Sequence, residues 1–90
     1  MDFQKHVFTR KTIDMAETGW NLRQIREARN LSVCEVARYL STTQQSVYNW
    51  ESGTPPKIWH LVSLCYLYII SLKDVIILKD QQAEYCDYDE

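Results

Sequence analysis

The sequence predicts an all-α fold in which five short helices pack into one compact domain. Ninety residues allow a single small hydrophobic core and leave little room for a second. Only two Gly and two Pro residues occur, which favours helices over a fold rich in β-hairpins. The one run that is typical of a strand, residues 75–78, is ambiguous. We therefore expect helices from about residue 20 onward.

The first helix is expected over residues 20–29, where Leu22 and Ile25 share one face. Residues 1–18, before it, show no sustained spacing of apolar side chains and are expected to form a loosely held N-terminal arm. Asn30 suits the end of the helix, because Asn adopts left-handed backbone more readily than most residues.

The second and third helices are separated by a very short break. Ser32 and Glu35 have the S-x-x-E spacing of a capping box, which predicts a helix over Val33–Leu40. A third helix is expected over residues 43–52. It ends at Gly53, and the two prolines that follow prevent its continuation.

The fourth helix, expected over Ile58–Tyr68, is apolar nearly all round. A last short helix should follow Ser71 as its cap, with Asp74 in the first turn. The fourth helix carries one apolar stripe that suits the core (Leu61, Leu64, Cys65, Tyr68) and a second one (Trp59, Val62, Tyr66, Ile69). A helix that is apolar on every side is buried on both sides. The second stripe therefore belongs either to a tight core or to a twofold interface between two copies of the chain.

The charges are unevenly distributed along the chain. The net charge is −2, but residues 80–90 contain five acidic and no basic side chains. The remainder has ten basic against seven acidic residues, so an acidic tail follows a mildly basic body. Two interpretations of the tail stay open: a solvated end, or a segment that competes with an anionic ligand or contacts a partner.

Several classes of protein are not expected from this sequence. Cys34, Cys65 and Cys86 are far apart and match no disulfide framework or zinc spacing, so no metal and no cofactor are expected. The sequence has no glycine-rich phosphate loop and no Ser or Cys with a plausible His partner, so it is not expected to be an enzyme. The longest apolar stretch is shorter than the roughly 20 residues of a membrane span, and no signal-peptide pattern is present, which predicts a cytoplasmic protein without membrane contact.

Residues 33–52 meet the steric demands of a helix-turn-helix unit, because Ala37 is small at the helix crossing and Ser41 lies at the tight turn. The stretch LRQIREARNLSVCEVARYLSTTQQSVYNWESG resembles the Cro and phage-repressor (XRE) helix-turn-helix family. IREARNLS, NWESG and YIISLKDVI carry the match, and the lead-in IDMAETGWNLRQIRE is similar to small stand-alone bacterial members. The resemblance implies a five-helix, lambda-repressor-like domain over residues 19–79, with helices 2 and 3 as the helix-turn-helix, between the arm and the tail (80–90).

TTQQS, residues 42–46, looks like the front of a phage-repressor recognition helix. The resemblance implies a sequence-specific DNA-binding transcription regulator that reads the major groove as a dimer on a near-palindromic site. Gln44 and Gln45 would read bases, since Gln can form paired hydrogen bonds with adenine, and Tyr48 and Asn49 would line the groove. The resemblance also implies that Thr43 caps this helix. An alternative stays open: Thr42 and Gln45 have capping-box spacing, and Gln45 would then bond to the backbone.

Phosphate contacts are predicted at the helix ends and in the loop after the third helix: Ser32, Thr43, Ser46, Thr54, Lys57 and Arg26. The resemblance also implies an ion pair between Arg26 and Glu51 that positions the recognition helix. The chain departs from the family at Val33, where a Gln often donates to phosphate, and at Ser41, where Gly is usual. These departures predict weaker DNA binding.

A second class of function remains open, a protein-interaction module such as an adaptor or an antitoxin-like partner that keeps the fold with little DNA readout. The acidic tail, Val33 and the apolar fourth helix favour it. Positive charge around the third helix would favour DNA, and a neutral surface would favour the adaptor. The expected partners are double-stranded DNA and a second copy bound through helix 4 or 5, and no small-molecule ligand is expected.

Overall fold

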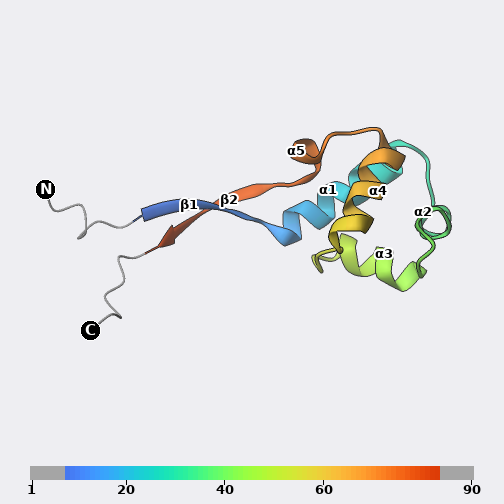
Figure 1. Ribbon diagram of the computed structural model, residues 1–90, viewed down its shortest axis with the longest axis horizontal. Coiled ribbons are helices and arrows are strands. Elements are labelled where there is room, and N and C mark those ends of the chain that lie inside the picture. The colour runs from blue at the N-terminus through green and yellow to red at the C-terminus, as the bar shows by residue number, and fades with distance from the viewer. Residues whose placement is uncertain (1–7, 84–90) are drawn as a thin grey trace, which may run out of the picture.

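The computed structural model describes residues 8–83, which form five helices and one two-stranded sheet (Figure 1). The all-α, five-helix fold is confirmed, with the small sheet as an addition. The elements are β1 (Phe8–Ile13), α1 (Met15–Ala28), α2 (Val33–Leu40), α3 (Gln44–Glu51), α4 (Ile58–Tyr68), α5 (Leu72–Val75) and β2 (Leu78–Ala83).

β1 and β2 pair antiparallel, from Phe8 opposite Ala83 to Ile13 opposite Leu78, and extend away from the helices (Figure 1). Residues 8–13 of the expected N-terminal arm thus form a strand, and residues 15–18 form the first turn of α1. The strand sequences FTRKTI and LKDQQA lack the apolar alternation of a half-buried strand, so they gave no local signal. Residues 1–7 and 84–90 lie outside the described residues, and the division into arm, domain and acidic tail stays a prediction.

Helix α1 begins at Met15, five residues before the expected start. Asp14 is its N-cap, and Asp14 Oδ1 accepts the backbone N–H of Glu17 at 3.1 Å. The buried Thr18 hydroxyl accepts the backbone N–H of Ile77 at 2.9 Å, which fastens the first turn to the segment before β2. Capping and this long-range contact outweigh the weak helix propensity of the Thr–Gly pair.

The α2–turn–α3 unit has the predicted first cap and the predicted turn. The capping box of Ser32 and Glu35 is present, and the backbone hydrogen bond from Ser32 lowers the pKa of Glu35. Ser41 has a left-handed backbone, with φ 58° and ψ 45°. The alternative in which Thr42 caps α3 is wrong, because Thr43 is the N-cap and its side chain accepts the N–H of Ser46.

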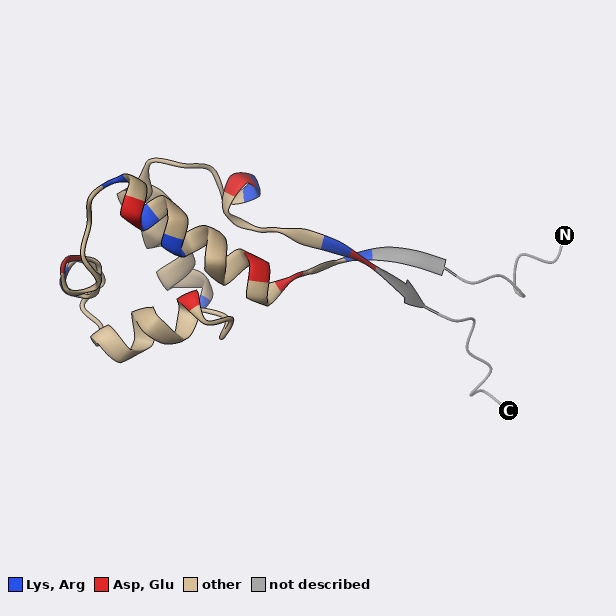
Figure 2. Cartoon of the chain, turned by 180° about the vertical axis from the view of Figure 1, so that it is seen from behind, with Lys and Arg blue, Asp and Glu red and all other residues tan. Residues whose placement is uncertain are grey.

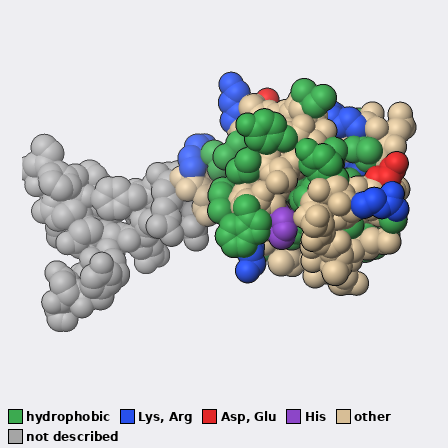
Figure 3. Space-filling model, turned by 45° about the vertical axis from the view of Figure 1, so that its right-hand side comes forward, with side chains coloured by type: hydrophobic (Ala, Val, Ile, Leu, Met, Phe, Trp, Pro, Cys, Tyr) green, Lys and Arg blue, Asp and Glu red, His purple; other side chains and the backbone are tan. Residues whose placement is uncertain are grey.

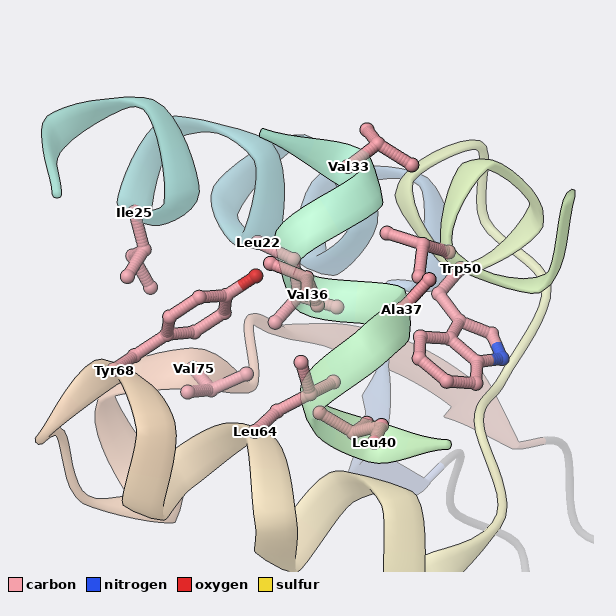
Figure 4. Close-up of a cluster of buried hydrophobic side chains, with 11 residues drawn as sticks. Leu22, Ile25, Val33, Val36, Ala37, Leu40, Trp50, Leu64, Tyr68 and Val75 are labelled. Atoms are coloured by element: carbon pink, nitrogen blue, oxygen red, sulfur yellow. The ribbon is translucent and has the colours of Figure 1, made fainter. Parts of the chain in front are cut away.

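Every helix contributes at least one nearly inaccessible side chain to a single core, and Figure 4 shows buried hydrophobic side chains converging between the helices. Five of them are Leu22, Val36, Val47, Leu64 and Val75, each at most 2% exposed. Burying a side chain of this size stabilises a fold by about 1.5–3 kcal/mol. The core therefore fixes α3 relative to α1 and α2, and with it the outer face of α3.

Helix α4 separates its two apolar stripes between core and surface. Leu64 and Tyr68 are buried, and Leu61 and Cys65 pack against the core. The second stripe is exposed, so its assignment to a tight core is wrong. The exposed fractions are 60% for Trp59, 45% for Val62, 75% for Tyr66 and 86% for Ile69.

Helix α5 begins after Ser71, as expected, but the Ser71 hydroxyl does not cap the backbone. It donates instead to Asp74 Oδ2 at 2.8 Å. α5 is one turn long and serves mainly to bring the buried Val75 into the core.

Candidate nucleic-acid interface

The outer face of α3 carries the four residues predicted to contact bases. Val47 and Trp50 point into the core, which leaves Gln44, Gln45, Tyr48 and Asn49 exposed on the other side of the same helix. Four side chains with hydrogen-bonding groups, at the start and middle of one short helix, form a surface that can hydrogen-bond to a ligand. The structure thus brings all four together on one helix.

Gln45 and Asn49 are joined one helical turn apart, with Gln45 Nε2 donating to Asn49 Oδ1 at 2.9 Å. A Gln amide has two N–H donors and one carbonyl acceptor. With one donor used, Gln45 keeps one N–H and its carbonyl oxygen for a ligand. Capping does not use Gln45, since Thr43 caps α3.

The front edge of α3 is a pair of hydroxyl groups. Thr43 Oγ1 accepts the backbone N–H of Ser46 at 3.1 Å and lies 3.0 Å from Ser46 Oγ. Both residues were predicted to contact phosphate. Their mutual hydrogen bond holds the two hydroxyl groups together beside the free N–H groups of the first turn of α3.

Arg26 of α1 and Glu51 at the end of α3 lie in contact, and their side chains are only 11% and 8% exposed. Arg26 Nε and one terminal nitrogen donate to the two carboxylate oxygens at 2.7 and 3.1 Å. Its other terminal nitrogen donates to the carbonyl of Leu31 at 2.9 Å. These hydrogen bonds with Glu51 raise the pKa of Arg26. The guanidinium group thus joins the helix that precedes the helix-turn-helix to the end of α3.

A cleft of about 500 Å³ lies between α1, the start of α2 and the outer face of α3, and we call it the α1–α3 cleft. It brings together five of the predicted site residues: Arg26, Ser32, Gln44, Tyr48 and Glu51. It also includes Trp20 and Arg23, which the sequence analysis did not select. Trp20, Arg23 and Arg26 follow one another at intervals of three residues, and residues three apart on a helix share a face. This spacing could have identified Trp20 and Arg23 from the sequence.

Thr54 and Lys57 lie outside the α1–α3 cleft, in the segment after α3. The backbone N–H of Thr54 donates to the carbonyl of Asn49 at 2.9 Å. The Lys57 ammonium lies 5.4 Å from the centre of the Trp59 ring. The predicted phosphate contacts therefore fall on two sides of α3 and not at one point.

Helix α3 itself carries little charge (Figure 2). Its sequence QQSVYNWE has no Lys or Arg, and its one acidic residue, Glu51, is paired with Arg26. Two positive groups that line the α1–α3 cleft beside it, Arg23 and Arg26, come from α1. Among residues 8–83, no three His, Cys, Asp or Glu side chains are placed to hold a metal ion. Within the same range no helix has the length and apolar character needed to cross a membrane.

Comparisons with known proteins show the family and the fold. A family model described as helix-turn-helix matches residues 22–74. The fold is similar to that of the restriction-modification controller protein C.AhdI from Aeromonas hydrophila, with a TM-score of 0.64 and 22% sequence identity. The match covers 69% of this chain and 96% of that one. No curated protein sequence matches the chain.

Proposed function

Because this chain belongs to the helix-turn-helix family of DNA-binding transcription regulators, we propose that it reads specific sites in the major groove with the outer face of α3. One observation carries the proposal: Gln44 and Gln45 are exposed at the first turn of α3, and capping uses neither. In this unit the start of the second helix approaches the base edges. Tyr48 and Asn49, one turn later, would line the groove.

Gln45 has the hydrogen-bonding groups that an adenine edge requires. Adenine presents an acceptor at N7 and a donor at N6, and a Gln amide can bind both. The contact with Asn49 leaves Gln45 one N–H and its carbonyl oxygen for these two groups. In this proposal Asn49 orients the Gln45 amide before DNA is bound.

The surrounding polar groups would hold the DNA backbone. Thr43 and Ser46 lie at the front of α3, Ser32 lies at the start of α2, and Thr54 and Lys57 follow α3. Hydroxyl groups at helix starts and a Lys side chain are suitable donors to phosphate. Arg26 has five N–H donors, of which Glu51 and Leu31 take three, so two remain for a phosphate.

We also propose that two copies associate through the exposed stripe of α4. Figure 3 shows hydrophobic side chains gathered on one face of the helical part of the molecule. Ile69 supports an interface there, because it is 86% exposed and holds a left-handed backbone (φ 54°) that is unfavourable for a β-branched residue. Beside the stripe lies an apolar groove of about 270 Å³ lined by Val62, Tyr66 and Leu72. A twofold dimer would place two recognition helices about 34 Å apart on a near-palindromic site.

A protein-interaction module is the second candidate, and two observations favour it. The recognition helix has no Lys or Arg, and its acidic residue is paired, so its own surface is nearly neutral. The apolar stripe of α4 is large and exposed. In this alternative the fold presents α4 to a different protein, and DNA binding is weak or absent. Neither candidate requires a cofactor, and a cytoplasmic location stays a prediction.

The deciding experiment measures binding to random duplex DNA against salt concentration and then selects preferred sites from a random pool. We expect a steep salt dependence and an enriched sequence with two half-sites. Gln44→Ala and Gln45→Ala should each cost about 1–3 kcal/mol on the selected site, because each removes a paired hydrogen bond to a base. Gln24→Ala is the matched control, since Gln24 is an exposed glutamine of α1 that does not line the α1–α3 cleft.

Undiminished specific binding by the Gln44→Ala, Gln45→Ala double variant would contradict base readout by α3. Salt-dependent binding without an enriched sequence would mean that the protein holds the DNA backbone only. No binding at low salt would favour the protein-interaction module.

A further inference from the structure

The α1–α3 cleft contains two arginines in different states. The Arg26 side chain is 11% exposed and bound to both carboxylate oxygens of Glu51 and to the Leu31 carbonyl. Most of its hydrogen-bonding capacity is already used. Arg23, one turn earlier on α1, is 51% exposed and pairs only with Glu27, at 3.1 Å and four residues along the same helix. Such exposed pairs contribute little free energy, so a stronger anion can replace Glu27 as the partner of Arg23.

Trp20 holds the Arg23 side chain at the cleft. The guanidinium carbon lies 5.6 Å from the centre of the Trp20 ring, within the range of a cation–π contact. The ring is 51% exposed although it is large and apolar. This arrangement limits the rotamers of Arg23 and keeps its charge at the wall of the cleft, which lowers the entropy cost of binding a ligand there.

The opposite wall of the cleft is the surface proposed to meet DNA. Gln44 and Tyr48 of α3 line it, and Ser32 and Val33 at the start of α2 close one side. The major groove is about 12 Å wide and a helix with side chains is about 10–12 Å across, so a helix in the groove lies directly between the two phosphate backbones. A cleft on the flank of α3 is then where one of those backbones passes.

We propose that the α1–α3 cleft is a binding site for a phosphate of the DNA backbone, that Arg23 binds the phosphate by exchanging Glu27 for it, and that Trp20 positions Arg23. The inference rests on the proposed DNA binding by α3 and adds Arg23 to Arg26 and Ser32, the two predicted phosphate contacts that line the same cleft. Val33 lines the same cleft and has no side-chain donor. Arg23 would therefore provide the charge-assisted hydrogen bond that Val33 cannot make.

The test compares salt titrations of DNA binding by the full chain and by Arg23→Gln. Loss of one phosphate contact makes the log–log slope less negative by about 0.9 and weakens binding to random and selected duplexes alike. Arg38→Gln is the matched control, because Arg38 is an exposed arginine of α2 that does not line the cleft and the substitution removes the same charge. We expect its slope to equal that of the unmodified protein.

Two further variants separate phosphate binding from a packing role. Arg23→Lys keeps the charge and should retain most of the slope. Glu27→Gln removes the carboxylate that competes for Arg23 and that also lies 4.0 Å from a terminal nitrogen of Arg26. It should tighten DNA binding in the unmodified protein by more than it does in Arg23→Gln. If Arg23→Lys binds DNA as weakly as Arg23→Gln, the proposal is overturned, because the effect would then come from packing of Arg23 on Trp20. Glu27→Gln with no larger gain in affinity in the unmodified protein than in Arg23→Gln would also overturn it.

The failure of this inference is distinguishable from failure of the proposed function. If the unmodified protein binds DNA with a steep salt slope and Arg23→Gln has the same slope and affinity, the phosphate site is wrong and DNA binding stands. An equal change of slope in Arg23→Gln and Arg38→Gln would also overturn the site, because the effect would then be one of net charge. If the unmodified protein does not bind DNA at low salt, the proposed function itself fails.

Discussion

Gly19 lies within α1 although Gly is among the poorest helix formers. The structure gives the reason. A Cβ atom at this position would lie 2.6 Å from the carbonyl oxygen of Trp50 and 2.7 Å from that of Glu51. Real Cβ atoms essentially never approach backbone this closely. The absent side chain therefore lets α1 and the end of α3 touch, next to the ion pair of Arg26 with Glu51.

Gly19→Ala should destabilise the fold even though Ala is the better helix former. The added methyl group would overlap backbone atoms, and overpacking of this kind costs about 1–3 kcal/mol. Urea unfolding measures the change, and Gln24→Ala on the exposed face of the same helix should be near neutral or slightly stabilising. If the Gly19→Ala protein is as stable as the unmodified one, α1 and α3 can move apart without loss of stability.

At the residue scale, the sequence could predict what depends on neighbours along the chain. The capping box of Ser32 and Glu35 has a local spacing, and so does the exposed position of the glutamines. Residue spacing alone did not decide between Thr42 and Thr43 as the cap of α3, because both residues are followed at suitable spacing by a polar partner. The family resemblance implied Thr43, and that prediction is confirmed. Trp20 and Arg23 were missed, since their place in the α1–α3 cleft depends on how α1 packs against α3.

The turn between α2 and α3 contains a residue in an unfavourable conformation. Ser41 has φ 58° and ψ 45°, and a non-glycine residue in this region costs about 1–2 kcal/mol. The left-handed backbone of Ser41 lets the N–H of Thr42 donate to the carbonyl of Ala37 at 2.9 Å, which ends α2 and starts the turn.

Ser41→Gly should stabilise the protein by about 0.5–1 kcal/mol, because the relieved strain exceeds the added flexibility of the unfolded chain. Ser52→Gly is the matched control. Ser52 also ends a helix, but its backbone is right-handed with φ −94°, so Gly there should only destabilise. Thermal unfolding of both variants measures the contrast, and a lower melting temperature for Ser41→Gly would mean that its side chain contributes more than the strain costs.

At the element scale, helices were predictable and strands were not. The helix ends were marked by local signals, such as the capping box of α2 and the prolines after α3. Only α1 began early, through Asp14 and a contact with distant Ile77. The strands β1 and β2 carry no such local pattern. Their pairing depends on contacts between opposite ends of the sequence, such as the 2.6 Å ion pair of Lys11 with Asp80. A short segment of the sequence therefore cannot reveal that the two strands pair.

At the scale of the whole molecule, the exposed stripe of α4 predicts self-association. Tyr66→Gln should shift the protein toward monomers, because Tyr66 is 75% exposed in the stripe and borders the apolar groove. Tyr39→Gln is the matched control, since Tyr39 is 56% exposed on α2 and lies outside the stripe. Sedimentation velocity over a range of concentrations measures both. An unmodified protein that stays monomeric throughout would contradict the dimer.

The pairing of β1 with β2 has a consequence for the order of events during synthesis. Lys11 and its partner Asp80 are 69 positions apart, so the ribosome completes β1 long before β2 exists. At about 5–20 residues per second, β1 waits roughly 3–14 s for its partner. Throughout that interval the nascent chain presents an unpaired strand, while the helices between the two strands can already fold. The last strand made thus shields the first from pairing with another chain.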